Sequence, residues 1–271
     1  MTAPTPAQLR TLLPRIIDTA KAAGQAIMAV YDNADRGIVQ KDDKTPVTDA
    51  DYAAHRLIVE QLGALQPQYP VLSEESESIP FAERAGWATY WLIDPLDGTR
   101  EFIKRNGEFT VNIALVHGHD TLLGVVYTPA LGITYEAAHG LGARRHDAHG
   151  TQRIHVRAAP PTPVIAGSRS HAGPHLQAML ENIGDYELIS MGSALKTCLV
   201  AEGRADLYPR LGLTSEWDTA AAQCVLEEAG GQLTDTQGRR LRYNTKESLL
   251  NPHFLAFGDA SRDWVGLCPA P

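Results

Sequence analysis

Two aspartates that directly follow an apolar run constrain the fold of this chain more than any other feature. The apolar run at residues 90–93 has the composition of a buried β-strand, and Asp94 and Asp97 follow it within the segment DPLDGT. An ionised carboxylate that is buried without a partner costs several kcal/mol, so a positive group is expected between these two side chains. Mg²⁺ fits best, because it takes oxygen ligands and is often completed by a substrate phosphate. The alternative is a turn in which aspartate only accepts backbone N–H groups.

The length and composition of the chain are those of an ordinary globular protein. With 271 residues, of which 44% are hydrophobic and 21% charged, it can bury a large core. The best internal boundary is the proline-rich stretch at residues 158–163, which predicts a short rigid crossing. We therefore expect an N-terminal α+β half, residues 1–157, that carries most of the metal ligands, and a C-terminal α/β half, residues 158–271, that completes the site.

Charge and cysteine usage exclude several classes of protein. A formal net charge of −8 argues against general nucleic-acid binding, which requires a basic surface that displaces counterions. Cys198, Cys224 and Cys268 are scattered and form no CxxC pair, so we expect reduced thiols. Because the sequence shows neither a secretion signal nor an apolar stretch of roughly 20 residues, no transmembrane segment is expected. The prediction is a cytoplasmic protein; peripheral association with the inner membrane, and the choice between monomer and homodimer, stay open.

Helix and strand patterns alternate along the chain and predict an α/β (α+β) fold. Thr5 and Gln8 form a capping box that starts a first helix, and Thr48 starts a second helix whose first turn holds Asp51. Apolar runs separated by Gly and Pro turns predict a largely antiparallel sheet. Its strands are expected at residues 110–116, 122–127 and 133–138, and further strands at 164–166 and 207–208 mix with helices that follow Ser193 and Trp217.

Five acidic residues share one kind of position, because each lies where a strand ends or a helix begins. Asp51 and Asp218 lie in first helical turns, and Glu74 follows the short apolar run at residues 71–72. Enzymes with α/β folds build their sites at such positions. For Asp51 or Asp218 alone, a capping role is the alternative. Together with the two aspartates after the longer apolar run, these residues predict a cluster that requires divalent cations.

Three stretches of the sequence resemble the signatures of the inositol monophosphatase superfamily, whose members are Mg²⁺-dependent and lithium-sensitive. These stretches are residues 72–76, 91–99 and 217–221. The resemblance implies a layered α-β-α-β-α sandwich, two or three bound Mg²⁺ ions and inhibition by Li⁺. It also implies a set of metal ligands, namely Glu74, Asp94, the Leu96 carbonyl, Asp97, Asp218 and, for a more weakly bound ion, Asp51.

The sequence after Thr99 favours one branch of this superfamily. Residues 100–115 resemble the bacterial CysQ type of 3′(2′),5′-bisphosphate nucleotidase, whereas inositol phosphatases usually continue with a small residue, Asn, Phe and a nearby His. The chain departs from the CysQ pattern at Ala194, where a second Ser is common, and at Asp49, where a small residue is common. Neither position is one of the implied metal ligands. Further stretches that resemble the same branch lie at residues 168–171, 192–196, 198–203 and 207–210.

The resemblance implies hydrolysis of adenosine 3′,5′-bisphosphate, a by-product of sulfate activation in sulfur assimilation, to AMP and phosphate. A metal-activated water would attack the phosphorus, with Glu74 and Thr99 positioning and deprotonating that water and Asp51 assisting. Backbone N–H groups of Gly98 and Thr99 are expected to cradle the phosphate. The C-terminal half is expected to complete a nucleotide pocket. The residues expected to bind substrate are Gly98, Thr99, Gly192, Ser193, Lys196, Arg210 and His171.

Alternatives remain open for these residues and for the function. Gly192 and Ser193 also fit the plain start of a helix, while Lys196 and Arg210 also fit solvated surface charges. A lone histidine such as His171 more often makes a structural hydrogen bond. An inositol-1-phosphate or sugar phosphatase is the nearest alternative enzyme, and the charged run after Thr99 disfavours it. The other alternative is a non-catalytic partner in a bacterial transcription complex, although such a protein has no physical need for five converging carboxylates.

Overall fold

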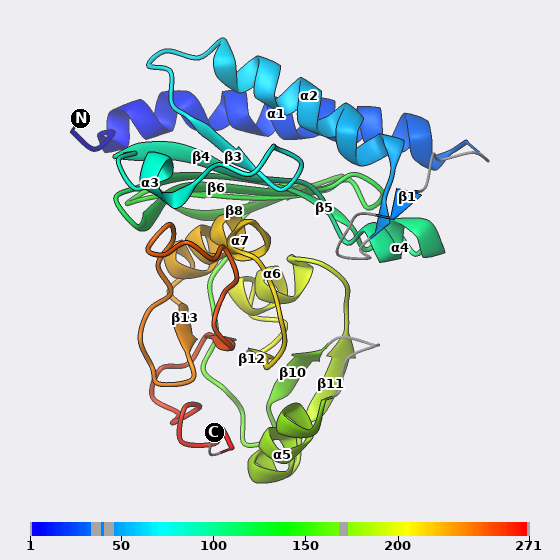
Figure 1. Cartoon of the computed structure of the whole chain (residues 1–271). Helices are drawn as coiled ribbons and strands as arrows, with labels where there is room; N and C mark the ends of the chain where they lie inside the picture. Colours follow the sequence, from blue (N-terminus) through cyan, green and yellow to red (C-terminus); the bar gives the residue numbers. More distant parts are fainter. Residues whose placement is uncertain (1, 34–38, 41–45, 168–172, 270–271) are drawn as a thin grey trace.

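Helices and sheets alternate in layers along one axis of the molecule (Figure 1). The computed structural model describes residues 2–33, 39–40, 46–167 and 173–269. Helices α1 (Pro6–Tyr31) and α2 (Asp49–Gly63) cover one face of a seven-stranded sheet, and α7 (Glu216–Glu228) packs on the other face. Helix α7 contacts α6 (Leu195–Ala201), which packs on a five-stranded sheet, and α5 (Pro174–Ile183) covers the far side of that sheet. The predicted α-β-α-β-α sandwich is therefore confirmed.

The first sheet is largely antiparallel, as the sequence predicts. Its strands run in the order β3-β4-β5-β6-β7-β8-β9, with β3 and β4 paired in parallel and the following pairs antiparallel. The hairpin of β8 and β9 is not predicted by the apolar pattern, because both strands are mostly polar. The bounds of the strands are β3 (Val71–Ser73), β4 (Thr89–Asp97), β5 (Thr110–His117), β6 (Asp120–Thr128), β7 (Ile133–Ala138), β8 (Gly142–Asp147) and β9 (Gly150–Arg153).

Capping boxes start the two helices that cover this sheet. The Thr5 N–H donates to Gln8 Oε1 (2.8 Å) at the start of α1, and the Thr48 N–H donates to Asp51 Oδ2 (2.8 Å) at the start of α2. Both predicted helix starts are therefore confirmed. The apolar faces of the helices share one buried cluster with Trp91 and other residues of the sheet. This packing places the first turn of α2, and with it Asp51, beside the residues that follow β4.

The second sheet has the strand order β11-β10-β12-β14-β13. Alternate residues of a strand face opposite sides, so Leu207 of β12 packs in the cluster with α5, while Tyr208 joins the core between the sheets. The strands predicted at residues 164–166 and 207–208 are confirmed. The bounds are β10 (Val164–Gly167), β11 (Glu187–Ser190), β12 (Leu207–Arg210), β13 (Gln232–Asp235) and β14 (Phe254–Phe257).

The proline-rich stretch joins the two sheets, since β9 ends at Arg153 and β10 begins at Val164. One buried cluster nevertheless draws residues from both sides of the stretch, among them Leu92 and Val225. The division into halves at residue 157 stays a prediction. In the described ranges, no helix combines the length and the apolar character that crossing a membrane requires. The remaining elements are α3 (Phe81–Arg84), α4 (Thr99–Lys104), β1 (Val39–Gln40) and β2 (Pro46–Val47).

Candidate metal and phosphate site

Strand β4 carries two of the predicted acids and is longer than the apolar run that predicts it. It extends to Asp97, and its pairing with β5 shifts register between Asp94 and Asp97. Such an irregularity bends a strand and re-aims its side chains. Glu74 follows the parallel neighbour β3, and its N–H donates to the Ile93 carbonyl (3.2 Å). The ends of two parallel strands therefore place Glu74 beside Asp94.

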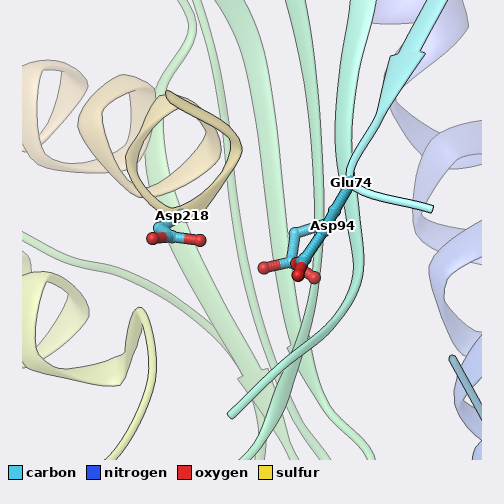
Figure 2. Close-up of side chains that lie close together, drawn as sticks. All are labelled: Glu74, Asp94 and Asp218. Carbon is cyan, nitrogen blue, oxygen red and sulfur yellow. The ribbon is translucent and has the colours of Figure 1, made fainter. Parts of the chain in front are cut away.

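Glu74, Asp94 and Asp218 form a cluster of carboxylates. One oxygen from each lies within 4.8 Å of the other two. Figure 2 shows Asp218, from the first turn of α7, facing Asp94 of β4 and Glu74, which directly follows β3. Asp218 also caps its helix, because its Oδ2 accepts the Ser215 N–H (2.8 Å). The capping role and the place in the cluster are thus compatible.

The cluster fits divalent cations. Asp94 is 1% exposed, and burial, followed by the charge of Glu74, raises its pKa well above the usual value. Burial and the charge of Asp97 raise the pKa of Asp218 in the same way. These shifts mean that the protein alone disfavours the ionised forms, and a bound cation reverses that preference. In the described part of the chain, the cluster consists of carboxylates and offers only oxygen ligands. Mg²⁺ prefers oxygen ligands, whereas zinc prefers nitrogen and sulfur, so the cluster fits Mg²⁺ better than zinc.

Asp97 links the acid cluster to a second segment of the chain. Its Oδ2 accepts the Ala194 N–H (2.6 Å) and a hydrogen from Asn112 Nδ2 (3.3 Å). Burial raises the pKa of Asp97, while the Lys196 ammonium opposes the shift. Ala194 is one of the positions where the sequence departs from the CysQ pattern. Because its backbone makes the contact, a serine side chain is not needed there for this link.

Asp51 and Thr99 approach one another from α2 and α4. Asp51 Oδ2 accepts hydrogens from the Thr48 N–H (2.8 Å) and the Thr48 hydroxyl (2.6 Å), so Asp51 does cap its helix. Its other oxygen, Oδ1, accepts the Thr99 hydroxyl (3.3 Å). The same hydroxyl lies 3.5 Å from the Leu96 carbonyl oxygen. The structure thus brings the predicted upstream acid, the predicted catalytic threonine and the predicted carbonyl ligand together.

The raised pKa of Asp51 predicts a pH dependence of stability. Burial raises this pKa from 3.8 to about 6, although hydrogen bonds from Thr48 oppose the shift. When the folded pKa of a carboxyl lies above its unfolded pKa, its stabilising contribution is complete below the unfolded value and is lost as pH rises through the folded value. As the pH rises from about 3 to about 7, metal-free wild type should therefore lose about 3 kcal/mol of unfolding free energy relative to metal-free Asp51→Asn, which has no carboxyl to ionise at this position. Urea unfolding in EDTA measures this difference, and a value that does not change with pH would contradict the prediction.

A cavity of about 300 Å³ adjoins the acid cluster. Asp97 and Asp218 line it, so two of the predicted metal ligands face the same space. Thr99 follows Gly98 at the start of α4. The predicted substrate-binding residues that line the cavity are Gly98, Gly192, Ser193, Lys196 and Arg210.

Among the described residues, the wall of this cavity also carries the cationic side chains of Lys196 and Arg210 and two buried polar atoms that lack a protein partner. Lys196 is 5% exposed; its Nζ donates to the Ser193 carbonyl (2.7 Å) and lies 5.1 Å from the centre of the Tyr208 ring. Burial lowers the pKa of Lys196 to about 8, while the charge of Asp97 opposes the shift. Within the described residues, Arg210 Nε and Ser193 Oγ are buried without a hydrogen-bond partner. Buried polar atoms normally have one, so these two groups favour an anionic ligand.

The sequence matches a known family over almost its whole length. The family model described as "Inositol monophosphatase family" matches residues 8–260. The chain belongs to the inositol monophosphatase family. This match contains both sheets and all five acids discussed above. The inositol monophosphatase family is generally metal-dependent, in agreement with the carboxylate cluster.

Relatives within the inositol monophosphatase family include proteins named CysQ. The chain is 49% identical over 244 residues to the 3′(2′),5′-bisphosphate nucleotidase CysQ of Escherichia coli (strain K12), which covers 90% of this chain and 98% of that protein. The crystal structure of CysQ from Bacteroides thetaiotaomicron is similar with a TM-score of 0.80 at 40% identity, over 90% of this chain and 96% of the other. Extragenic suppressor protein suhB from Bartonella henselae is similar with a TM-score of 0.76 at 27% identity, over 94% and 95% of the two chains. The resemblance to the CysQ type is therefore confirmed.

The turn before α6 differs from one expectation. Ala194 occupies the N-cap position of α6, and Ser193 precedes it with a φ of +49°. Gly192 and Ser193 therefore precede the helix start that the sequence predicts at these residues, because they form the turn that leads into α6, and their contact with substrate stays a prediction. His171 lies outside the described residues.

Two aromatic residues of the cavity are missed by sequence analysis. Tyr208 and Phe254 line the cavity, and their rings pack edge to face with centroids 5.6 Å apart. Each lies in a short apolar run, a pattern typical of core strands. Their place at the cavity results from the antiparallel pairing of β12 with β14, which joins strands far apart in this inositol monophosphatase fold.

Proposed function

We propose that the chain is a 3′(2′),5′-bisphosphate nucleotidase that hydrolyses adenosine 3′,5′-bisphosphate to AMP and phosphate. The curated CysQ relatives are named for this class of activity. The observation that carries the proposal is the single cavity lined by Asp97 and Asp218 as well as by Lys196 and Arg210. A substrate with two phosphates can contact both the acidic and the cationic side of the cavity, whereas a monophosphate leaves Ser193 Oγ and Arg210 Nε without a partner. The reaction would recycle this nucleotide during sulfur assimilation.

Mg²⁺ is the proposed cofactor. Support comes from the oxygen ligands of the cluster and from the burial that raises the pKa of Asp94. When bound, Mg²⁺ neutralises phosphoryl oxygens and lowers the pKa of a bound water. Inhibition by Li⁺ is expected from the superfamily that the sequence resembles. The residues proposed to hold two ions and a weaker third are Glu74, Asp94, the Leu96 carbonyl, Asp97, Asp218 and Asp51.

Three side chains are proposed to handle the attacking water. Glu74 offers a carboxylate oxygen that accepts the proton of the water. Because Asp51 Oδ1 accepts the Thr99 hydroxyl, the Thr99 oxygen is directed to accept a hydrogen from that water. Gly98, with a φ of +95°, forms the turn before α4, and the backbone N–H groups of Gly98 and Thr99 are proposed to bind the phosphate under attack.

The second phosphate is proposed to bind Ser193, Lys196 and Arg210. Among the described residues that line the cavity, Ser193 and Arg210 each carry a buried polar atom without a hydrogen-bond partner, namely Ser193 Oγ and Arg210 Nε. With a pKa lowered to about 8, Lys196 is still mostly protonated at neutral pH, and a bound phosphate would raise its pKa again. Gly192 lies in the same turn, and His171 stays a predicted contact to the nucleotide.

A substrate panel tests the proposal. In Mg²⁺, kcat/KM for adenosine 3′,5′-bisphosphate should exceed that for inositol 1-phosphate and for sugar phosphates by at least about a hundredfold, because a monophosphate leaves buried polar groups unpaired. Lys196→Met should narrow this preference, whereas Lys21→Met, on an exposed face of α1, should not. Added Li⁺ should inhibit. Faster turnover of inositol 1-phosphate would favour an inositol phosphatase, and no release from any substrate would contradict an enzymatic role.

A further inference from the structure

Glu108 lies between two glycine turns that line the cavity. A Cβ added to Gly98 would lie 3.2 Å from the Glu108 carbonyl oxygen and 3.4 Å from Ser193 Cβ. A Cβ added to Gly192 would lie 2.6 Å from the same carbonyl oxygen and 3.0 Å from Glu108 Cβ. The turn before α4, the segment before β5 and the turn before α6 are therefore in direct contact. The two turns come this close to Glu108 because each has glycine at the contact.

The carboxylate of Glu108 holds the turn before α6. The Gly192 N–H donates to Glu108 Oε2 (2.9 Å). Farther along the same turn, the Ser193 carbonyl accepts Lys196 Nζ (2.7 Å), and the next backbone N–H donates to Asp97 Oδ2 (2.6 Å). Hydrogen bonds to an ionised partner are stronger than neutral ones. The positive φ of Ser193 is unfavourable for a residue with a side chain and persists where the surroundings enforce it.

Glu108 acts on the cavity from outside it. Ser193 and Lys196 belong to the described residues that line the cavity, whereas Glu108 does not. The charge of Glu108 also favours the protonated form of Lys196, against the effect of burial on the pKa of that lysine. Glu108 is thus placed to affect two groups of the proposed second phosphate site without touching the ligand.

We infer that Glu108 is a positioning residue, which fixes the turn at residues 192–196 so that Ser193 and Lys196 meet the second phosphate of a bisphosphate nucleotide. This inference rests on the proposed function. Without the carboxylate, the Gly192 N–H loses its acceptor and the turn relaxes, which displaces Ser193 and Lys196 together. Discrimination in favour of a second phosphate is then lost, while Glu74 and Asp94 keep their places.

The experiment compares kcat/KM for adenosine 3′,5′-bisphosphate with kcat/KM for adenosine 3′-monophosphate. Glu108→Ala should lower this ratio about tenfold, because small displacements of binding groups have effects of at least this size. Glu108→Gln keeps an oxygen acceptor with the same reach and should retain most of the ratio, whereas Glu108→Asp is too short and should lose it. Glu228→Ala is the matched control. Like Glu108, Glu228 accepts glycine N–H groups, those of Gly140 (3.0 Å) and Gly142 (2.9 Å), and it is not among the described residues that line the cavity.

Binding of AMP, which carries the second phosphate alone, gives a readout without turnover. Calorimetric titration in Mg²⁺ should show about tenfold weaker binding for Glu108→Asp, a smaller loss for Glu108→Gln, which keeps the acceptor oxygen but not the charge, and unchanged binding for Glu228→Ala. If wild type prefers the bisphosphate but Glu108→Asp keeps both the ratio and the AMP affinity, the inference is overturned and the proposed function stands. A wild type without preference for the bisphosphate overturns the proposed function, and the inference with it. Because the Asp and Gln variants decide the outcome, it does not depend on the folding of Glu108→Ala.

Discussion

Asp94→Asn should reduce phosphate release by at least about a thousandfold while the protein stays folded. The Asp94 side chain is buried, and its Oδ1 accepts the Leu96 N–H (3.0 Å), a bond that the asparagine oxygen can also accept. The substitution keeps the shape of the side chain but removes one negative charge from the cluster. Since burial, followed by the like charges nearby, already raises the pKa of Asp94, its neutral analogue should leave the metal-free protein at least as stable as wild type.

Thermal unfolding in EDTA and phosphate release in Mg²⁺ measure the two halves of this prediction. Asp235→Asn provides a matched control, because Asp235 is also buried and accepts backbone N–H groups, those of Gln237 and Arg239 (2.9 Å each), in a turn at the end of β13. The control should keep its activity. Near-wild-type release by Asp94→Asn would remove Asp94 from the mechanism.

Removal of divalent cations should stop phosphate release and lower the unfolding temperature of wild type. A ligand at about a hundred times its Kd stabilises the folded state by about 2.7 kcal/mol. For a chain of this size, that corresponds to a shift of about 5–10 °C. The physical reason is the repulsion among Glu74, Asp94 and Asp218, whose oxygens lie within 4.8 Å of one another.

Scanning calorimetry with EDTA, and then with Mg²⁺ in excess over EDTA, measures this shift. Asp94→Asn serves as the comparison, because it has one charge fewer to neutralise and should show a smaller gain from Mg²⁺. Activity should return when Mg²⁺ is added back. Equal unfolding temperatures in the two solutions, or full turnover in EDTA, would show that the carboxylates do not act through a cation.

Local sequence patterns predict those parts of the structure that depend on neighbouring residues. The helix starts at Thr5 and Thr48 follow from capping residues three positions apart, and the structure shows both. The convergence of Glu74, Asp94 and Asp218 is also predictable, because each lies at the end of a strand or the start of a helix, and the structure places them together. Their roles as ligands of Mg²⁺ stay a prediction.

The remaining features depend on pairings that local patterns do not contain. The hairpin of β8 and β9 is mostly polar, so it lacks the alternation that marks a strand. Glu108 follows a glycine in a charged stretch and is typical of a surface turn, yet its carboxylate meets the N–H of Gly192, 84 residues later. Tyr208 reaches the cavity through the pairing of β12 with β14. The contacts of Glu108 and Tyr208 join segments that lie far apart in the sequence, so local patterns do not predict them.

The packing of α7 has a consequence for synthesis of the protein on the ribosome. Strands β3 to β9 are translated before α7, which covers the apolar face of β5 and β6 and brings Asp218 to Glu74 and Asp94. A nascent chain that ends before α7 therefore exposes hydrophobic surface and is prone to aggregate. Its three-carboxylate centre is also incomplete, so the ribosome must translate the whole of α7 before the chain can both bury this apolar surface and bring Asp218 to Glu74 and Asp94.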